Sequence, residues 1–198
     1  MKKLTERQKQ AISTELKITQ VAMELFITNG YYSVKVQDIC TAAEVSVGAF
    51  YHYFKSKSEI FNKGYMRVDA MLQEKVEAIS SFDSTKDEIL FILGEAGALL
   101  QELSWNFVAQ AYKHLMFEHP KYTLQADRFV FLQLEKAIEA GIKKNELIAS
   151  VNPSELTITL LRVSRGVIFD WCLHEGTYDL REKTKSDVYL ILTNYLTV

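Results

Sequence analysis

The stretch VSVGAFYHYFKSK, residues 45–57, contains five ring-bearing side chains in a row, from Phe50 to Phe54. Successive residues of an α-helix point about 100° apart around the axis, so a helix cannot bury all of them. Phe50 and Phe54 are four residues apart and share one face, which we expect to face the core. Tyr51, His52 and Tyr53 then point elsewhere. The sequence predicts a short helix over residues 47–54 with a partly outward-facing aromatic surface.

Two amphipathic helices are predicted upstream. The first ends near Gly30, a candidate left-handed C-cap, and the second covers residues 36–43. Ser46 can cap the third helix, because its hydroxyl can accept a hydrogen bond from the first turn. Two short helices behind a longer one predict a helix-turn-helix, a motif that places its second helix in the major groove of DNA. The apolar positions with helical spacing are Ile18, Val21, Ala22, Leu25 and Phe26 in the first helix, and Val36, Ile39, Cys40 and Ala43 in the second.

The rest of the chain is also predicted to be helical. Eight glycines and two prolines provide too few turn signals for a β-sandwich or barrel. Asn152, Pro153 and Glu155 suit the N-cap, N1 and N3 positions of one helix. We therefore expect an all-α fold with a three-helix DNA-binding domain, residues 1–56, and a connecting helix plus helical bundle, residues 57–198. The helices expected after residue 57 are 58–80, 85–103, 105–118, 122–144, 153–174 and 184–196.

Charge is distributed unevenly along the 198 residues. Residues 1–57 hold eight Lys or Arg and five acidic residues, a net charge of +3, whereas the remainder carries −5. A basic end on an acidic body permits binding to a polyanion through that end. The hydrophobic fraction of 48% excludes a disordered chain.

Several classes of protein and site are disfavoured. No run approaches the ~18 apolar residues of a membrane span, so a soluble cytoplasmic protein without membrane contact is expected. Cys172 and His174, two residues apart on a helix, do not face each other, and we expect no enzyme and no cofactor. His114, Glu118 and His119 form too sparse a set for a metal site, since only the first two share a helix face.

The ordered residues of the N-terminal segment resemble the TetR family of bacterial transcriptional repressors. The resemblance covers roughly residues 10–65 without gaps. The residues that match are Ile18-x-x-Val21-Ala22-x-x-Leu25-Phe26-x-x-x-Gly30-Tyr31, then Val36-x-Asp38-Ile39-x-x-x-Ala43-x-Val45-Ser46-x-Gly48-x-Phe50-Tyr51-x-Tyr53-Phe54-x-Ser56-Lys57-x-x-Ile60-Phe61.

The resemblance implies a role for individual residues in DNA binding. Tyr51 and Lys57 would contact phosphates, which position a protein without reading sequence. Gln37 would read a base, and Val47 and Ala49 could touch only thymine methyls or sugar. The family commonly has Lys and Thr at these last two positions, so specificity here would depend more on DNA shape. The full set of expected DNA-binding residues is Gln37, Ser46, Val47, Gly48, Ala49, Tyr51, His52, Tyr53 and Lys57.

The resemblance also implies a homodimer formed through residues 153–174 and 184–196. One apolar stripe of the first of these helices comprises Leu156, Leu160, Val163 and Val167, and another comprises Leu161, Ile168 and Trp171. A helix that is apolar on two sides must be covered twice, and a second subunit would cover one side. Arg162 and Arg165 interrupt these stripes, and we expect them to pair with Asp170 or with acidic residues of the partner. The alternative is that they recognise an acidic effector.

Family members respond to small molecules bound among the middle helices. The expected ligand-binding residues are Trp105, Tyr112, Met116, Phe129 and Trp171. The resemblance thus implies a repressor that binds a palindromic operator and is released by a small-molecule effector. The alternative hypothesis is a helical protein-interaction scaffold without sequence-specific DNA binding.

Overall fold

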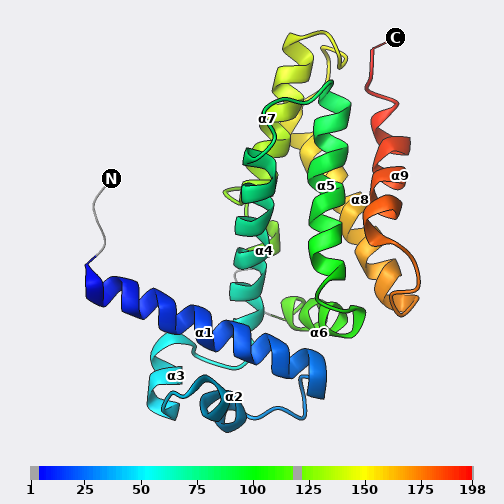
Figure 1. Ribbon diagram of the computed structural model, residues 1–198. Helices are drawn as coiled ribbons and strands as arrows, with labels where there is room; N and C mark the ends of the chain where they lie inside the picture. The colour runs from blue at the N-terminus through cyan, green and yellow to red at the C-terminus, as the bar shows by residue number, and fades with distance from the viewer. Residues whose placement is uncertain (1–4, 118–121, 198) are drawn as a thin grey trace.

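The computed structural model describes residues 5–117 and 122–197, and their regular structure is helical, as predicted (Figure 1). An isolated β-bridge between Leu147 and Leu196 adds one antiparallel contact. The elements are α1 (Glu6–Asn29), α2 (Val36–Ala43), α3 (Val47–Tyr53), α4 (Glu59–Glu77), α5 (Thr85–Gln101), α6 (Trp105–Leu115), the 3-10 helix η1 (Tyr122–Leu124), α7 (Phe129–Lys143), α8 (Pro153–Leu173) and α9 (Leu180–Leu192).

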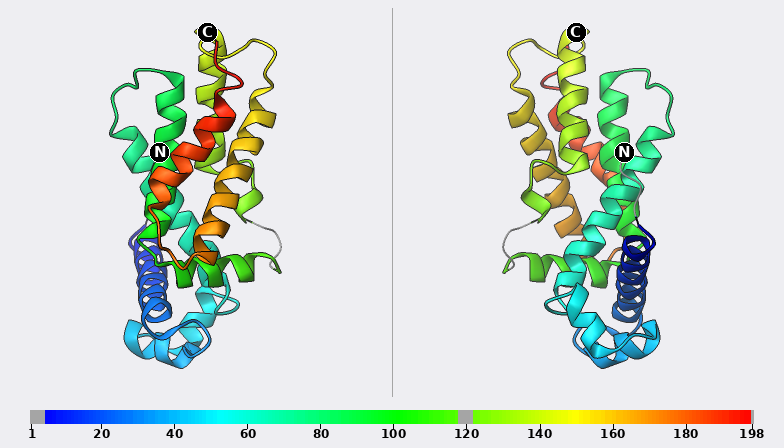
Figure 2. Two further views of the ribbon diagram at one scale, coloured as in Figure 1. Left: turned by 90° about the vertical axis from the view of Figure 1, so that its right-hand side faces the viewer. Right: turned by 90° about the vertical axis from the view of Figure 1, so that its left-hand side faces the viewer.

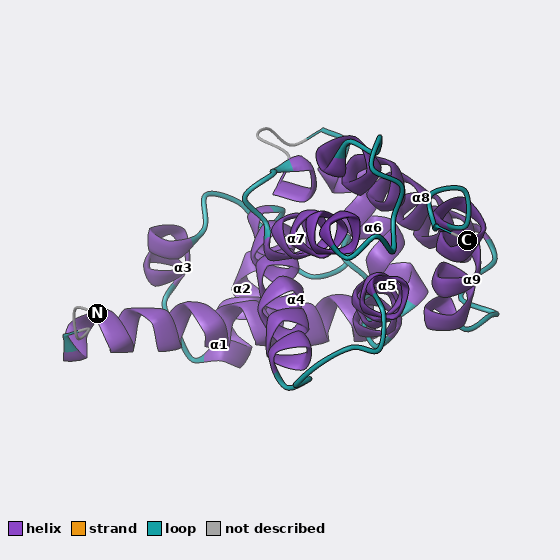
Figure 3. Ribbon diagram, turned by 90° about the horizontal axis from the view of Figure 1, so that it is seen from above, coloured by secondary structure: helices purple, strands orange, loops and turns teal. Residues whose placement is uncertain are grey.

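The helices form a small head, α1–α3, and a larger body, α4–α9. Figure 1 shows the head below the body, with α4 rising from one into the other. The left view of Figure 2 faces α8 and α9, which form one side of the body. From above, Figure 3 shows α1 extending away from the end of the body where α8 and α9 lie. None of the described helices combines the length and apolarity that a membrane span requires.

Local capping accounts for several helix boundaries that the sequence predicts. The Ser46 hydroxyl accepts a hydrogen bond from the Ala49 amide at 3.0 Å at the start of α3. Gly30 ends α1 with a left-handed backbone, φ 78°, a conformation that costs glycine little. At the start of α8, Asn152 accepts a bond from the Glu155 amide at 3.1 Å. These three predictions are confirmed.

The largest departures from the predicted bounds are in two helices. Residues 122–144 form η1 and α7 rather than one helix, because Arg128 has an extended backbone, φ −66° and ψ 145°. Its guanidinium donates to the Thr123 carbonyl and to Asp69 of α4, which fixes the interruption. The last helix begins at Leu180 rather than residue 184, since Asp179 accepts a bond from the Glu182 amide at 3.0 Å. It ends at Leu192, before the segment that pairs with Leu147.

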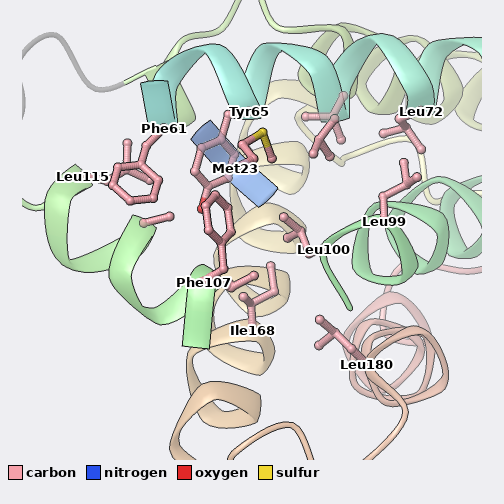
Figure 4. Packing of buried hydrophobic residues seen from close by; sticks show 14 of the residues in the cluster. Met23, Phe61, Tyr65, Leu72, Leu99, Leu100, Phe107, Leu115, Ile168 and Leu180 are labelled. Atoms are coloured by element: carbon pink, nitrogen blue, oxygen red, sulfur yellow. The ribbon is translucent and has the colours of Figure 1, made fainter. Parts of the chain in front are cut away.

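The head and the body share one hydrophobic core. Phe61, near the start of α4, packs against Phe26 and Tyr31 of the head, with ring centroids 5.6 and 5.0 Å apart. It also packs against Phe107 of α6 at 5.3 Å. Figure 4 shows Phe61 and Tyr65 on α4 facing the side chains of α6, with Ile168 of α8 beyond. The expected domain boundary near residue 56 therefore separates helices that are packed together.

Candidate DNA-binding surface and ligand cavity

The recognition helix α3 buries two of its rings and exposes another. Phe50 and Phe54 are 0% and 1% exposed, as predicted, whereas Tyr51 is 55% exposed. Most of the expected DNA-binding residues lie on the outer surface of α2 and α3. Gln37, Ser46, Val47, Gly48, Tyr51 and His52 are exposed, while Ala49, Tyr53 and Lys57 are half-buried.

The turn between α2 and α3 depends on Glu44, which the sequence reasoning did not single out. Its backbone is left-handed, φ 57°, a conformation that is uncommon for a residue with a side chain. Its carboxylate accepts a hydrogen bond of 2.7 Å from Lys17 of α1. That bond and the Lys17 charge lower the pKa of the exposed Glu44 carboxyl. The interaction connects the turn to α1 and orients α3 on the head.

Lys57 points into the head rather than freely into solvent. Its Nζ donates to the carbonyl oxygens of Tyr31 at 2.5 Å and Val34 at 2.7 Å, and lies 4.0 Å from the centroid of the Tyr31 ring. Partial burial lowers the pKa of its ammonium group. Lys35 and Lys55, which flank the α2–α3 segment in the sequence, are exposed. The sequence analysis did not include these two lysines among the DNA-binding residues. Their positions could have indicated them, because Lys35 directly precedes α2 and Lys55 follows the C-cap of α3.

A cavity lies between α4–α8 and η1, in two adjoining hollows. The inner hollow has a volume of about 60 Å³ and is lined from α4, α5, α6 and α8, with η1 and α7 closing it. The outer one measures about 170 Å³. Tyr112 lines the inner hollow, as expected of a ligand-binding residue. Both hollows share Thr123, Arg128, Val130, Leu161 and Arg165.

The other four expected ligand-binding residues do not line this cavity. Trp171 is 2% exposed and donates its indole N–H to the Tyr178 carbonyl at 3.0 Å. Trp105 packs against Gly176 at the loop between α8 and α9. Met116 is 58% exposed at the end of α6. Phe129 lines a separate open groove formed by residues 76–88 and 129–144.

The cavity wall contains a buried ion pair with an added phenol. The Arg128 guanidinium donates to both Asp69 oxygens, at 2.6 and 2.8 Å, and the Tyr122 hydroxyl donates to the same carboxylate at 2.7 Å. Burial and the bond to Asp69 raise the pKa of Tyr122. Burial likewise raises the pKa of the Tyr112 phenol, so it stays protonated.

The expected pairing of Arg162 and Arg165 with Asp170 is wrong for the part of the chain that the structure describes, whereas pairing with acidic residues of a partner stays a prediction. Asp170 accepts a hydrogen bond from the Tyr178 hydroxyl at 2.9 Å and lies 3.7 Å from His174. Arg162 is exposed, and Arg165 is half-buried in the cavity wall. Burial lowers the pKa of the Arg165 guanidinium.

The two predicted apolar stripes of α8 are largely covered by the chain's own helices. Leu156, Leu160, Val167, Ile168 and Trp171 are each at most 6% exposed. The assignment of one of these stripes to a partner is therefore wrong. The exposed apolar side chains of α8 and α9 are instead Ile158, Phe169, Leu173, Tyr189 and Leu190.

Comparison with known proteins gives matches to the head and to the whole chain. Residues 18–63 match the family model of the bacterial regulatory proteins of the tetR family. The transcriptional regulator UidR of Escherichia coli K12 is 26% identical over 170 residues, covering 82% of this chain and 84% of the relative. Residues 18–63 therefore form a DNA-binding segment of the TetR family, and the chain resembles a regulator of transcription over most of its length. TetR-family proteins are transcriptional regulators and not enzymes.

Two solved structures of transcriptional regulators share the fold. FadR of Thermus thermophilus, a repressor in complex with lauroyl-CoA, is 19% identical with a TM-score of 0.71, covering 93% of this chain and 96% of that one. FadR of Bacillus subtilis, in complex with stearoyl-CoA, is 18% identical with a TM-score of 0.70, covering 90% and 97%. The whole chain therefore has the TetR-family architecture, and not only its head.

Residues 5–117 and 122–197 contain no cluster of three or more His, Cys, Asp or Glu side chains that could hold a metal ion. His114 stacks on Phe61 with ring centroids 5.1 Å apart. Glu118 and His119 lie outside the described residues. Cys172 directs its thiol toward the Trp105 carbonyl at 3.7 Å rather than toward His174, and burial raises its pKa to about 11.

Proposed function

We propose that this protein is a homodimeric TetR-family repressor that binds a palindromic operator and is released by a small molecule. The observation that supports DNA binding best is the recognition helix itself. Its core contacts are made by Phe50 and Phe54, whereas Val47, Tyr51 and His52 are exposed on its outer side. A helix stabilised from behind in this way can enter the major groove with its N-terminal turn exposed.

The exposed residues divide into two kinds of DNA contact. Tyr51 has a hydroxyl for a phosphate, and Lys35 and Lys55 add positive charge beside it. Gln37 can bond an adenine bidentately, and Val47 can touch a thymine methyl. Lys57, which bonds backbone carbonyls of the head, would position α4 against the head rather than contact a phosphate.

The proposed dimer forms through α8 and α9. Their exposed apolar side chains are Ile158, Phe169, Leu173, Tyr189 and Leu190. The two helices themselves form the side of the body that faces the viewer in the left view of Figure 2. Gly166 supports close approach of a second helix there. A Cβ at this glycine would meet nothing within 4 Å in the subunit, so packing inside the chain does not require the small residue.

The cavity is the proposed effector site. The FadR proteins of similar fold were solved with acyl-CoA molecules, which supports a ligand with an apolar part. An effector releases the operator only through unequal affinity for the free and DNA-bound forms. DNA and effector must therefore weaken each other's binding by the same factor.

Selection of binding sequences from a random DNA pool tests the DNA-binding part. We expect a palindromic site bound by two subunits, with Tyr51→Phe weakening all sequences about equally. Gln37→Ala should relax preference at one base pair per half-site by about 1–3 kcal/mol. Recovery of no preferred sequence, together with binding that does not depend on salt, would favour the interaction-scaffold alternative.

A further inference from the structure

Arg165 lies in the cavity wall without an anionic partner in the described part of the chain. It is half-buried and lines both the inner and the outer hollow. The charged side chains that act electrostatically on Arg165 are Arg128 and Arg162, and both are positive like Arg165 itself. A partly desolvated cation surrounded by like charges raises the free energy of the empty protein unless an anion joins it.

Arg128, which lines the same hollows, is in a different situation. Asp69 neutralises it through two hydrogen bonds, and Tyr122 completes the carboxylate's contacts. The Asp69 carboxylate, which is the negative charge of the cavity wall, is thus already paired with Arg128. Arg165 is therefore the guanidinium in this wall that remains available to a ligand.

Tyr65 provides a second, independent observation at the inner end. It is 8% exposed, lines the inner hollow, and its hydroxyl has no hydrogen-bond partner among residues 5–117 and 122–197. Figure 4 shows its ring pointing from α4 toward Phe107. Burial raises the pKa of this phenol far above its usual value, so it is a donor at neutral pH. Buried hydroxyls are rarely unpaired in proteins, and a ligand oxygen would satisfy this one.

Apolar side chains line much of the inner hollow that Tyr65 and Arg165 share. They come from α4, α5, α7 and α8. The charge of Arg165 acts on the Tyr112 phenol, which lines the same hollow, and opposes the rise of its pKa on burial. Such a wall favours a hydrocarbon chain or ring, since it offers few polar partners. The apolar residues are Val68, Leu93, Ala96, Leu100, Val130, Leu161 and Ile168.

We propose that the cavity binds a small carboxylate with an apolar chain and a polar oxygen at its far end. Arg165 binds the carboxylate, which matches the planar fork of a guanidinium. The Tyr65 hydroxyl donates to the far oxygen, and the chain lies along α5 and α8. The role of this molecule as the effector rests on the proposed function, whereas its binding does not.

Calorimetric titration of the DNA-free protein tests the proposal with ω-hydroxyoctanoate, octanoate and octanol. We expect Arg165→Gln to weaken both carboxylates about tenfold, equivalent to one charged hydrogen-bonding contact, and to leave octanol unchanged. Tyr65→Phe should reduce the affinity for ω-hydroxyoctanoate to that for octanoate. Arg67→Gln is the matched control, because it removes the same charge from an exposed position on α4 and should change nothing.

Equal carboxylate affinity in the wild type and Arg165→Gln would overturn the proposal. Tighter binding of octanoyl-CoA than of ω-hydroxyoctanoate would also overturn it, because the acyl end of octanoyl-CoA has no carboxylate. Equal affinity for ω-hydroxyoctanoate in Tyr65→Phe would refute the polar inner end. Fluorescence anisotropy on the selected operator separates the two proposals: binding as expected without operator release would refute the effector role and support the ligand assignment.

Discussion

Lys57 and Lys55 are two residues apart, yet their charges lie in different surroundings. The Lys57 ammonium donates to two backbone carbonyls of the head, and Lys55 is exposed. We expect Lys57→Met to lower the free energy of unfolding by about 1–3 kcal/mol, because two carbonyls lose a charged donor. Lys55→Met should change it by less than about 0.5 kcal/mol. Urea unfolding followed by circular dichroism measures both.

The two lysine variants also control for each other in a DNA-binding measurement. Lys55→Met should lower the slope of log affinity against log salt by about one unit, whereas Lys57→Met should leave the slope unchanged. A loss of slope for Lys57→Met alone would mean that its ammonium leaves the carbonyls for a phosphate in the complex.

At the scale of elements, the Asp69–Arg128 pair connects α4 to the start of α7. Its side chains are only 7% and 12% exposed. Asp69→Ala should therefore destabilise the fold by about 3–5 kcal/mol, since it leaves a buried guanidinium unpaired. Thermal and urea unfolding measure the loss. The double variant Asp69→Leu with Arg128→Met should recover much of it, and a double variant as unstable as Asp69→Ala would contradict this account.

The last helix presents neighbouring leucines to opposite environments. Leu190 is 64% exposed, and Leu192 is 0% exposed. We expect Leu190→Glu to halve the mass measured by light scattering, because it adds charge to the proposed dimer surface, and to retain helical circular dichroism. Leu192→Glu should instead unfold the body, since a carboxylate cannot be solvated there. A Leu190→Glu protein that remains a dimer would place the interface elsewhere.

At the scale of the whole molecule, α6 connects the cavity to the head. Tyr112 of α6 lines the inner hollow, and His114, two residues on, lies against the Tyr31 and Phe61 rings at 4.2 and 5.1 Å. A ligand that shifts α6 therefore acts on the side chains that hold α4 and the head together. Coupling through packed rings requires that both arrangements remain well packed.

We expect His114→Ala to reduce the coupling between effector and operator more than it reduces either affinity alone. Operator affinity is measured by anisotropy with and without a saturating ligand, and the ratio of the two gives the coupling factor. Linkage requires that the ligand's affinity change by the same factor when operator is present, which provides an internal check. An unchanged ratio in His114→Ala would exclude this route.

The sequence by itself determined the head and the helical class of the body. The inward direction of Phe50 and Phe54, the Ser46 and Asn152 caps and the Gly30 terminus depend on spacing and on bonds within a few residues. Such features are local, so they can be read from a single segment. The same locality explains why Tyr51 could be predicted to face outward.

Only the tertiary structure decided which faces meet. The interruption before α7 depends on Asp69, 59 positions away from Arg128. The Lys57 ammonium turns inward because two carbonyls of the α1–α2 loop lie within reach. The stripes of α8 proved to be internal, and the cavity formed around Tyr65 and Arg165 instead of the tryptophans. Helical spacing shows that a face is apolar, but what covers it depends on residues distant in the chain, and those contacts form only when the helices pack.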